Sequence, residues 1–196
     1  MSQWDERYSS AEYVYGIKPN VFLAEQLAHL PHGSILFPCE GEGRNAVYAA
    51  QQGFTVSAFD GSAEGKKKAL ALAKESGVTI NYAVDDAMHI EYAPESFDII
   101  VLIFAHFPAD IRKQIHQRIV TWLKPGGTIL LEAFQPLQMP LTSGGPKDIS
   151  MLYTSDMLFD DFEMMDDIVI AHESIILDEG PLHQGKAEVI RMIAKK

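Results

Sequence analysis

The sequence predicts an α/β protein with a doubly wound, Rossmann-like, mostly parallel sheet and a late antiparallel hairpin. Three observations carry this prediction. Short apolar segments alternate with segments of helical composition through the first two thirds of the chain. The run 97–104 is almost continuously apolar, which is typical of a central parallel strand buried on both faces. Two late strand-like segments follow one another without a helix between them, which indicates antiparallel pairing.

Length and composition predict one domain over residues 1–196 and exclude several functions. The 196 residues are 47% hydrophobic, but no apolar run is long enough to span a membrane, and the polar start lacks a signal peptide. One cysteine excludes an internal disulfide framework, so we expect a reducing, cytoplasmic location. The formal charge of −11 argues against nucleic acid as a partner. We expect the only basic cluster, 66–68, to be a solvated helix face.

Residues 34–45 read as a buried strand, a glycine turn and the start of a helix. Residues 35–38 are mostly apolar, residues 39–43 contain two glycines, and the helical run 46–50 is closed by Gly53. Glycine lacks Cβ, so a ligand can approach the backbone closely. The helix start also presents unpaired N–H groups. We therefore expect this turn to hold the polar part of a nucleotide-like cofactor.

Two cofactor classes compete for this turn. Gly41-x-Gly43-x-x-Ala46 satisfies the loose dinucleotide fingerprint, which is a weak signal by itself. An acidic residue before G-x-G, here Glu40, is instead the pattern of S-adenosyl-L-methionine (SAM) sites. A pyrophosphate would be repelled by Glu40 and Glu42, whereas the cationic groups of SAM would be attracted. The alternative is an ordinary turn whose carboxylates face water.

The N-terminal part, 1–30, is expected to form a flap and a helix. Aromatic residues are dense over 4–16 and either pack a surface helix on the core or cover the cofactor or substrate. Pro19 is expected to open a helix because proline suits the first helical position. Its apolar face would include Leu23, Leu27 and Leu30.

The remaining elements follow from apolar runs and breakers. We expect strands at 54–59, 78–84, 97–104 and 128–133, and helices at 63–76 and 109–123. Residues 135–148 show no clear period and read as a loop within a substrate-side insertion, 135–165, that also holds a short helix at 153–162. Strands 167–177 and 187–195 form the hairpin, joined by 178–186.

Carboxylates follow the second and third strands, where ligands bind in this architecture. Asp60 lies 17 positions after Gly43, a distance suited to binding both ribose hydroxyls of an adenosine, in NAD and SAM alike. The alternative is a carboxylate that stabilises a helix N-terminus. Either Asp85 or Asp86 could accept from the adenine amine, and we favour Asp86 because the N–H of Ala87 directly follows it.

With these motifs in place, the chain resembles the class I SAM-dependent methyltransferases over nearly its whole length. The motifs are C-E-G-E-G at 39–43, F-D at 59–60, D-D-A at 85–87, F-D-I-I-V at 97–101 and L-K-P-G-G at 123–127. It is most similar to the tellurite-resistance and thiopurine-type enzymes, through W-D-E-R-Y at 4–8, Y-V-Y-G-I-K-P-N at 13–20, F-A-H-F-P at 104–108 and E-G-P-L-H-Q-G-K at 179–186. Pro38-Cys39 departs from the class, which often has an aspartate and a small residue there.

The resemblance implies that SAM is the cofactor and a small molecule the methyl acceptor. The implied cofactor residues are Cys39, Glu40, Gly41, Gly43, Asp60, Gly61, Ser62, Asp86, Ala87 and Phe104. Methyl transfer needs no metal, and the seven histidines show no metal-ligand spacing with Cys39.

We expect the acceptor to be a thiol, a selenol or an oxyanion. The candidate catalytic residues are His106, His183 and Arg191. His106 follows the fourth strand, and His183 lies in the hairpin loop between the last two strands. Arg191 lies in an apolar alternating run and is either a pocket charge for an oxyanion or an exposed edge residue. Two alternatives remain: an NAD(P)-dependent oxidoreductase using the same glycine turn, and a SAM-binding module without turnover. The acceptor's identity and the oligomeric state are left open.

Overall fold

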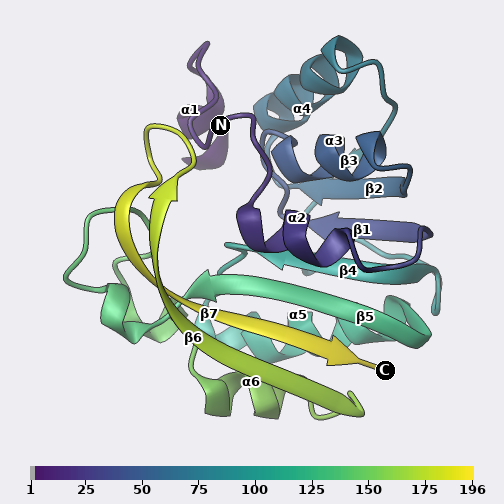
Figure 1. Cartoon of the computed structure of the whole chain (residues 1–196), viewed down its shortest axis with the longest axis vertical. Coiled ribbons are helices and arrows are strands. Elements are labelled where there is room, and N and C mark those ends of the chain that lie inside the picture. Colours follow the sequence, from purple (N-terminus) through teal and green to yellow (C-terminus); the bar gives the residue numbers. More distant parts are fainter. Residues whose placement is uncertain (1–2) are drawn as a thin grey trace. The chain divides into compact units, whose positions relative to one another are not determined.

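The computed structural model describes residues 3–196 (Figure 1). The first two residues of the predicted flap lie outside the described residues. The chain divides into two compact units: residues up to Ile90 with Glu179–Leu182, and Glu91–Asp178 with His183–Lys196. No helix within residues 3–196 is long and apolar enough to cross a membrane.

Three parallel strands form the sheet of the first unit. Their order is β3-β2-β1, with β1 at Ser34–Pro38, β2 at Thr55–Asp60 and β3 at Asn81–Val84. Leu36 pairs with Ser57, and Ala58 pairs with Tyr82. The helices α3, Arg44–Gln51, and α4, Ala63–Glu75, follow β1 and β2 (Figure 1). All three strands therefore end at the same edge, where the predicted cofactor residues lie.

The N-terminal helices of this unit are shorter than predicted. They are α1, Gln3–Tyr8, and α2, Val21–Leu27. The prediction that Pro19 opens the second helix is wrong. Asn20 is the N-cap instead, and its side-chain oxygen accepts a 3.0 Å hydrogen bond from the N–H of Leu23. An asparagine side chain satisfies a helix-end donor, which proline cannot do.

Four strands and two helices form the second unit. The strand order is β4-β5-β7-β6, with β4 at Phe97–Ile103, β5 at Leu123–Phe134, β6 at Asp167–Asp178 and β7 at Gln184–Lys195. The helices are α5, Ala109–Trp122, and α6, Ser155–Asp161. β4 and β5 are parallel, whereas β7 is antiparallel to both β5 and β6. The long curved hairpin of β6 and β7 in Figure 1 confirms the predicted late antiparallel pair.

Three strands begin several residues away from their predicted starts, whereas the other boundaries differ little. β5 begins at Leu123, because that residue pairs with Phe97 before the register shifts. The glycines at 126 and 127 therefore lie inside the strand as an irregularity. β7 begins at Gln184, so the segment joining the hairpin is shorter than 178–186. β3 begins only at Asn81.

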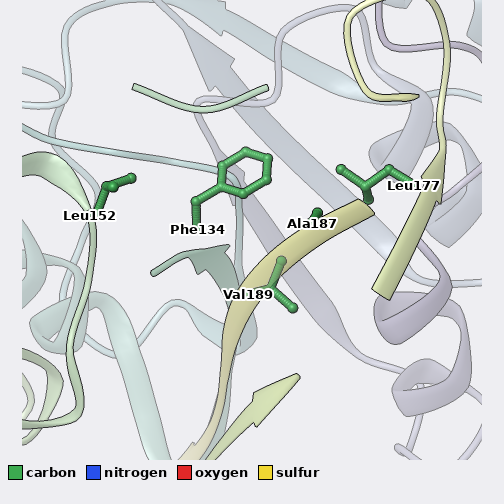
Figure 2. Close-up of a cluster of buried hydrophobic side chains, with 5 residues drawn as sticks. All are labelled: Phe134, Leu152, Leu177, Ala187 and Val189. Atoms are coloured by element: carbon green, nitrogen blue, oxygen red, sulfur yellow. The ribbon is translucent and has the colours of Figure 1, made fainter. Parts of the chain in front are cut away.

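An apolar cluster at the end of β5 anchors the second unit. Figure 2 shows its members, which are contributed by β5, β6, β7 and the segment before α6: Phe134, Leu152, Leu177, Ala187 and Val189. All five side chains are buried. Because these residues come from distant parts of the chain, the cluster holds the hairpin and the insertion together at the carboxyl end of β5.

The predicted loop 135–148 is tied to β7. It contains the turn η1, Pro136–Gln138, and is followed by η2, Ile149–Met151. The Gln138 side chain donates to Ser143 Oγ at 2.9 Å and accepts from the N–H of Glu188 at 2.9 Å. Ser143 Oγ in turn donates to the Lys186 carbonyl at 2.6 Å. A buried amide thus fastens this loop to the strand, and its role towards substrate stays a prediction.

Candidate functional site

In the turn after β1, Cys39 and Gly43 both have a positive φ angle. Gly43 has φ of +91° and is the N-cap of α3. A Cβ at this glycine would lie 2.5 Å from the Ala69 Cβ on α4, so no larger residue fits. Cys39 adopts φ of +55°, a region that costs a non-glycine residue of order 1–3 kcal/mol. Such strain clusters at ligand sites, which agrees with the predicted role of this turn.

Glu40 caps the helix that follows the turn. Its Oε1 accepts hydrogen bonds from the N–H groups of Asn45 at 2.9 Å and Ala46 at 2.8 Å. Burial raises the pKa of Glu40 to about 7, against the lowering effect of these bonds and of Arg44. A carboxylate with this pKa gains from a cation placed beside it. Glu40 therefore does not simply face water.

Glu42 points to the N-terminal segment. Its buried carboxylate forms an ion pair with Lys68 and accepts a 3.3 Å hydrogen bond from the N–H of Tyr15. The Lys68 ammonium also donates to the Ser10 carbonyl at 2.9 Å. The predicted solvated face is thus wrong for Lys68, which anchors the N-terminal segment. The repulsion expected against a pyrophosphate depends on Glu40 alone.

Asp60 connects the glycine turn to the turn after β2. Its Oδ2 accepts from the N–H of Gly41 at 3.1 Å, and its Oδ1 accepts from the N–H of Ser62 at 2.9 Å. Burial, with 5% of the residue exposed, raises its pKa to about 6. The N-cap of α4 is Ser62, which accepts from Gly65 N–H. The alternative role predicted for Asp60, at a helix N-terminus, is therefore filled by Ser62.

The aromatic N-terminal segment covers the glycine turn. Tyr8 is buried, and its hydroxyl lies 2.6 Å from where a Cβ of Gly41 would stand. Asp5 accepts hydrogen bonds from Ser62 Oγ at 2.7 Å and from the N–H of Ala63 at 3.0 Å. The helix α1 is thus fastened to the cofactor side of the unit. Asp5 was not predicted from the sequence, because a partly buried acidic residue in a short helix gives no signal of its distant partner.

The aspartates after β3 lie beside Asp60. The N–H of Asp85 donates to the Asp60 carbonyl at 3.1 Å. Asp86 is exposed and accepts from the N–H of Met88 at 2.7 Å, which starts a turn. The N–H of Ala87 makes no hydrogen bond within residues 3–196, so it is available to a ligand. This is the donor that the adenine prediction requires.

The donor set of this unit fits an adenosine that carries a cation. Asp60 and Glu40 are desolvated carboxylates, which hydroxyl donors or a cation would stabilise in the charged form. A Cβ on Gly61 would meet no atom within 4 Å, so the space beside Asp60 is open. The residues present therefore suit SAM, through its ribose and its ammonium group.

In the second unit, aromatic rings gather at the ends of β4 and β5. Phe104, with φ of +54°, stacks on Phe134 with ring centroids 4.6 Å apart. His183 packs its ring edge-to-face against Phe104 at 4.7 Å and Phe134 at 5.6 Å. His183 is buried. The structure thus brings the predicted residues Phe104 and His183 together.

His106 uses both of its ring nitrogens on backbone groups. Its Nδ1 lies 2.7 Å from the Met151 carbonyl, and its Nε2 accepts from the N–H of Phe134 at 3.1 Å. Nδ1 therefore carries the proton that is donated to Met151. Burial lowers the pKa of His106 to about 4. The ring is neutral at neutral pH, so this geometry favours a supporting role over the predicted role as a base or anion site.

Arg191 lies on β7 directly opposite Glu132 on β5. Its Nε donates to Glu132 Oε2 at 2.6 Å, and the Glu132 carboxylate is completely buried. The Arg191 side chain is 21% exposed. Within residues 3–196 no group of three or more metal-ligating side chains is placed to hold a metal ion.

The comparisons with known proteins give a family match for part of the chain and several solved structures with the same fold. Residues 35–127 match a family described as a methyltransferase domain. No curated protein sequence matches the chain. Among solved structures, the chain is similar to a SAM-dependent methyltransferase from Methanosarcina mazei, with a TM-score of 0.70, 18% identity, and coverage of 91% of this chain and 98% of that one.

Two further structures share the fold. TehB from Haemophilus influenzae gives a TM-score of 0.67 at 16% identity, over 98% of this chain and 65% of that one. The other structure is phosphoethanolamine N-methyltransferase 2 from Haemonchus contortus, in complex with phosphomonomethylethanolamine and S-adenosylhomocysteine. It gives a TM-score of 0.73 at 18% identity, over 100% of this chain and 61% of that one. Residues 35–127 therefore match a methyltransferase domain, and the chain shares the fold of these three structures.

Proposed function

We propose that this enzyme methylates a small-molecule nucleophile of the thiol, selenol or oxyanion type. One observation carries the proposal: His183 is buried against the stacked rings of Phe104 and Phe134, where β4 and β5 end. Buried aromatic side chains would exclude water from a small nucleophile placed beside His183. The formal charge of −11 further disfavours a polyanionic acceptor.

The cofactor contacts are assigned from the strand-end groups of the first unit. Asp60 would accept from the ribose hydroxyls, beside Gly61 and Ser62. Asp86 and the N–H of Ala87 would bind the adenine edge. SAM supplies a methyl group on a positively charged sulfur, which a nucleophile displaces in line.

The backbone of the glycine turn completes the cofactor contacts. Glu40 would attract the methionyl ammonium, and Cys39, Gly41 and Gly43 would bring their backbone close to the methionyl part. The predicted contact of Phe104 with the cofactor stays a prediction. The protein's own task is to orient the acceptor and exclude water.

The acceptor side is assigned to His183 and Arg191, with His106 behind them. The imidazole of His183 could take a proton from a thiol or selenol. The positive charge of Arg191, whose side chain is 21% exposed, could attract an oxyanion. His106 supports the aromatic ring of Phe134, because its Nε2 fixes the Phe134 N–H. The resemblance to tellurite-resistance and thiopurine-type enzymes supports the same small, anionic or soft acceptors.

Two measurements test this function. Calorimetry should give heat with S-adenosylhomocysteine and none with NAD, and the reverse result would favour the oxidoreductase. Product detection with a panel of thiols, selenols and oxyanions should then give methylated product, which His183→Ala should reduce without changing cofactor affinity. Cofactor binding with no product from any of these acceptors would leave the SAM-binding module without turnover.

A further inference from the structure

The tip of the β6–β7 hairpin packs with the first unit, although both strands belong to the second. Glu179–Leu182 falls in the first unit. The N–H of Leu182 donates to the Val14 carbonyl at 3.1 Å. Gly180 has φ of +101°, and a Cβ there would lie 2.3 Å from the Gly16 nitrogen. The tip is therefore held by a backbone crossing that only glycine allows.

The Glu179 carboxylate divides its two oxygens between two elements. Oε2 accepts from the Arg44 guanidinium at 2.9 Å, and Oε1 accepts from the Asn20 side-chain amide at 3.1 Å. Each of the three residues has at most 9% of its surface exposed. Breaking a buried ion pair leaves one charge desolvated, so this contact strongly prefers one geometry.

Both partners of Glu179 act on the start of α3. Arg44 is the first residue of that helix, directly after Gly43. The N–H of Asn20 donates to Asn45 Oδ1 at 2.9 Å, and the N–H of Asn45 donates to Glu40. A chain of contacts therefore leads from the hairpin tip to the carboxylate assigned to the methionyl ammonium.

The N-terminal segment joins the same network. Arg44 also donates to the Lys18 carbonyl at 3.4 Å, and the N–H of Tyr15 donates to Glu42 in the glycine turn. The segment 14–20 is thus held on one side by the hairpin tip and on the other by the turn. Releasing the tip would loosen the cover of the cofactor turn as well as the helix start.

We propose that Glu179 is a positioning residue for SAM: by holding Arg44 and Asn20 from the hairpin tip, it keeps the glycine turn and the N-terminal segment closed on the bound cofactor. This inference rests on the proposed placement of the cofactor at the glycine turn. Since His183 follows Glu179 by four positions, the tip connects the acceptor side to the cofactor side through the chain itself.

The test compares Glu179→Gln with a matched loss of another buried ion pair. The control is Asp161→Asn, because Asp161 pairs with Arg112 at 2.6 Å in the second unit and has no assigned role in binding. S-adenosylhomocysteine affinity is measured by calorimetry, its dissociation rate by stopped-flow displacement, and the melting temperature without ligand. We expect Glu179→Gln to weaken binding at least tenfold through faster dissociation, and Asp161→Asn to bind within twofold of the parent while melting lower.

A second variant reaches the tip without touching the carboxylate. Gly180→Ala should also speed dissociation, because the added Cβ pushes the tip off the N-terminal segment. If both tip variants bind like the parent, Glu179 is only structural and the proposal fails. A parent that does not bind S-adenosylhomocysteine overturns the placement of the cofactor and this inference together, whereas normal parental binding with unaffected variants overturns this inference alone.

Discussion

At the scale of the residue, the cofactor carboxylates do two things at once. Asp60 organises backbone N–H groups of two turns, and Glu40 caps a helix. Each carboxylate oxygen has more than one acceptor position, so these bonds leave capacity for a ligand. The type and position of both residues could be predicted from the sequence. Their backbone partners could not, since those depend on how the turn closes.

Asp60→Ala is expected to weaken SAM binding by about 1.5–3 kcal/mol, the scale of a hydrogen bond to a charged group. It should also lower stability, because the N–H groups of Gly41 and Ser62 lose their acceptor. Calorimetry with SAM and urea unfolding measure the two effects. Parental affinity in the variant would show that Asp60 only organises the turns.

His106→Asn is expected to lower the free energy of unfolding at pH 7.5 by about 1–3 kcal/mol, because a buried backbone group loses its partner. The pKa of His106 is lowered to about 4, so the folded state binds fewer protons than the unfolded state between pH 6.5 and 4. The stabilisation from neutral His106 is therefore present above pH 6.5 and lost as the pH falls. Urea unfolding of parent and variant should converge on acidification, and a constant difference would contradict this account.

At the scale of the element, the accuracy of each predicted boundary depended on the helix-breaking and helix-capping residues beside it. The alternation of strands and helices was predicted well because buried runs are long and bounded by glycine or proline. The start of α2 was predicted wrongly. Pro19 and Asn20 are both residue types that begin helices, and only the hydrogen bond from the N–H of Leu23 to the Asn20 side chain shows that Asn20 is the cap. The start of β5 was missed because Leu123 pairs before the irregularity at 124–127.

Asn20→Ala is expected to lower the free energy of unfolding by about 0.5–2 kcal/mol through loss of the α2 cap alone. The true loss should lie near the top of that range, because Asn20 also donates to Glu179. Thermal or urea unfolding measures this loss of stability. Thr154→Ala is the matched control, because it removes the N-cap side chain of α6, which accepts a hydrogen bond from the N–H of Met157. A loss no larger than the control's would show that the Glu179 contact adds no stability.

At the scale of the whole molecule, the contacts that complete the cofactor side join distant parts of the sequence. Glu179 and Asn20 are 159 positions apart, and no periodicity or spacing predicts such a pair. The aromatic cluster likewise combines β4, β5 and the hairpin. The fold class and the individual site residues follow from local patterns, whereas their meeting depends on the complete topology.

Ligand binding should stabilise the folded chain by mass action. S-adenosylhomocysteine at a hundred times its dissociation constant adds about 2.7 kcal/mol. For a chain of this size that corresponds to a rise in melting temperature of roughly 5–11 °C. Scanning calorimetry over a series of ligand concentrations checks it, with NAD as the comparison. A melting temperature independent of S-adenosylhomocysteine would contradict the cofactor assignment.

The turn conformation of Cys39 has a practical consequence for labelling chemistry. It is the only cysteine of the chain, and burial with the nearby Asp60 raises its thiol pKa far above the usual range. Thiol reagents react with the thiolate, so this side chain stays largely inert at neutral pH. A cysteine introduced at an exposed position, such as Leu182→Cys on the hairpin tip or Trp4→Cys on α1, can therefore receive a fluorophore selectively. The native turn can then be left intact while the movements of those two segments are followed by energy transfer.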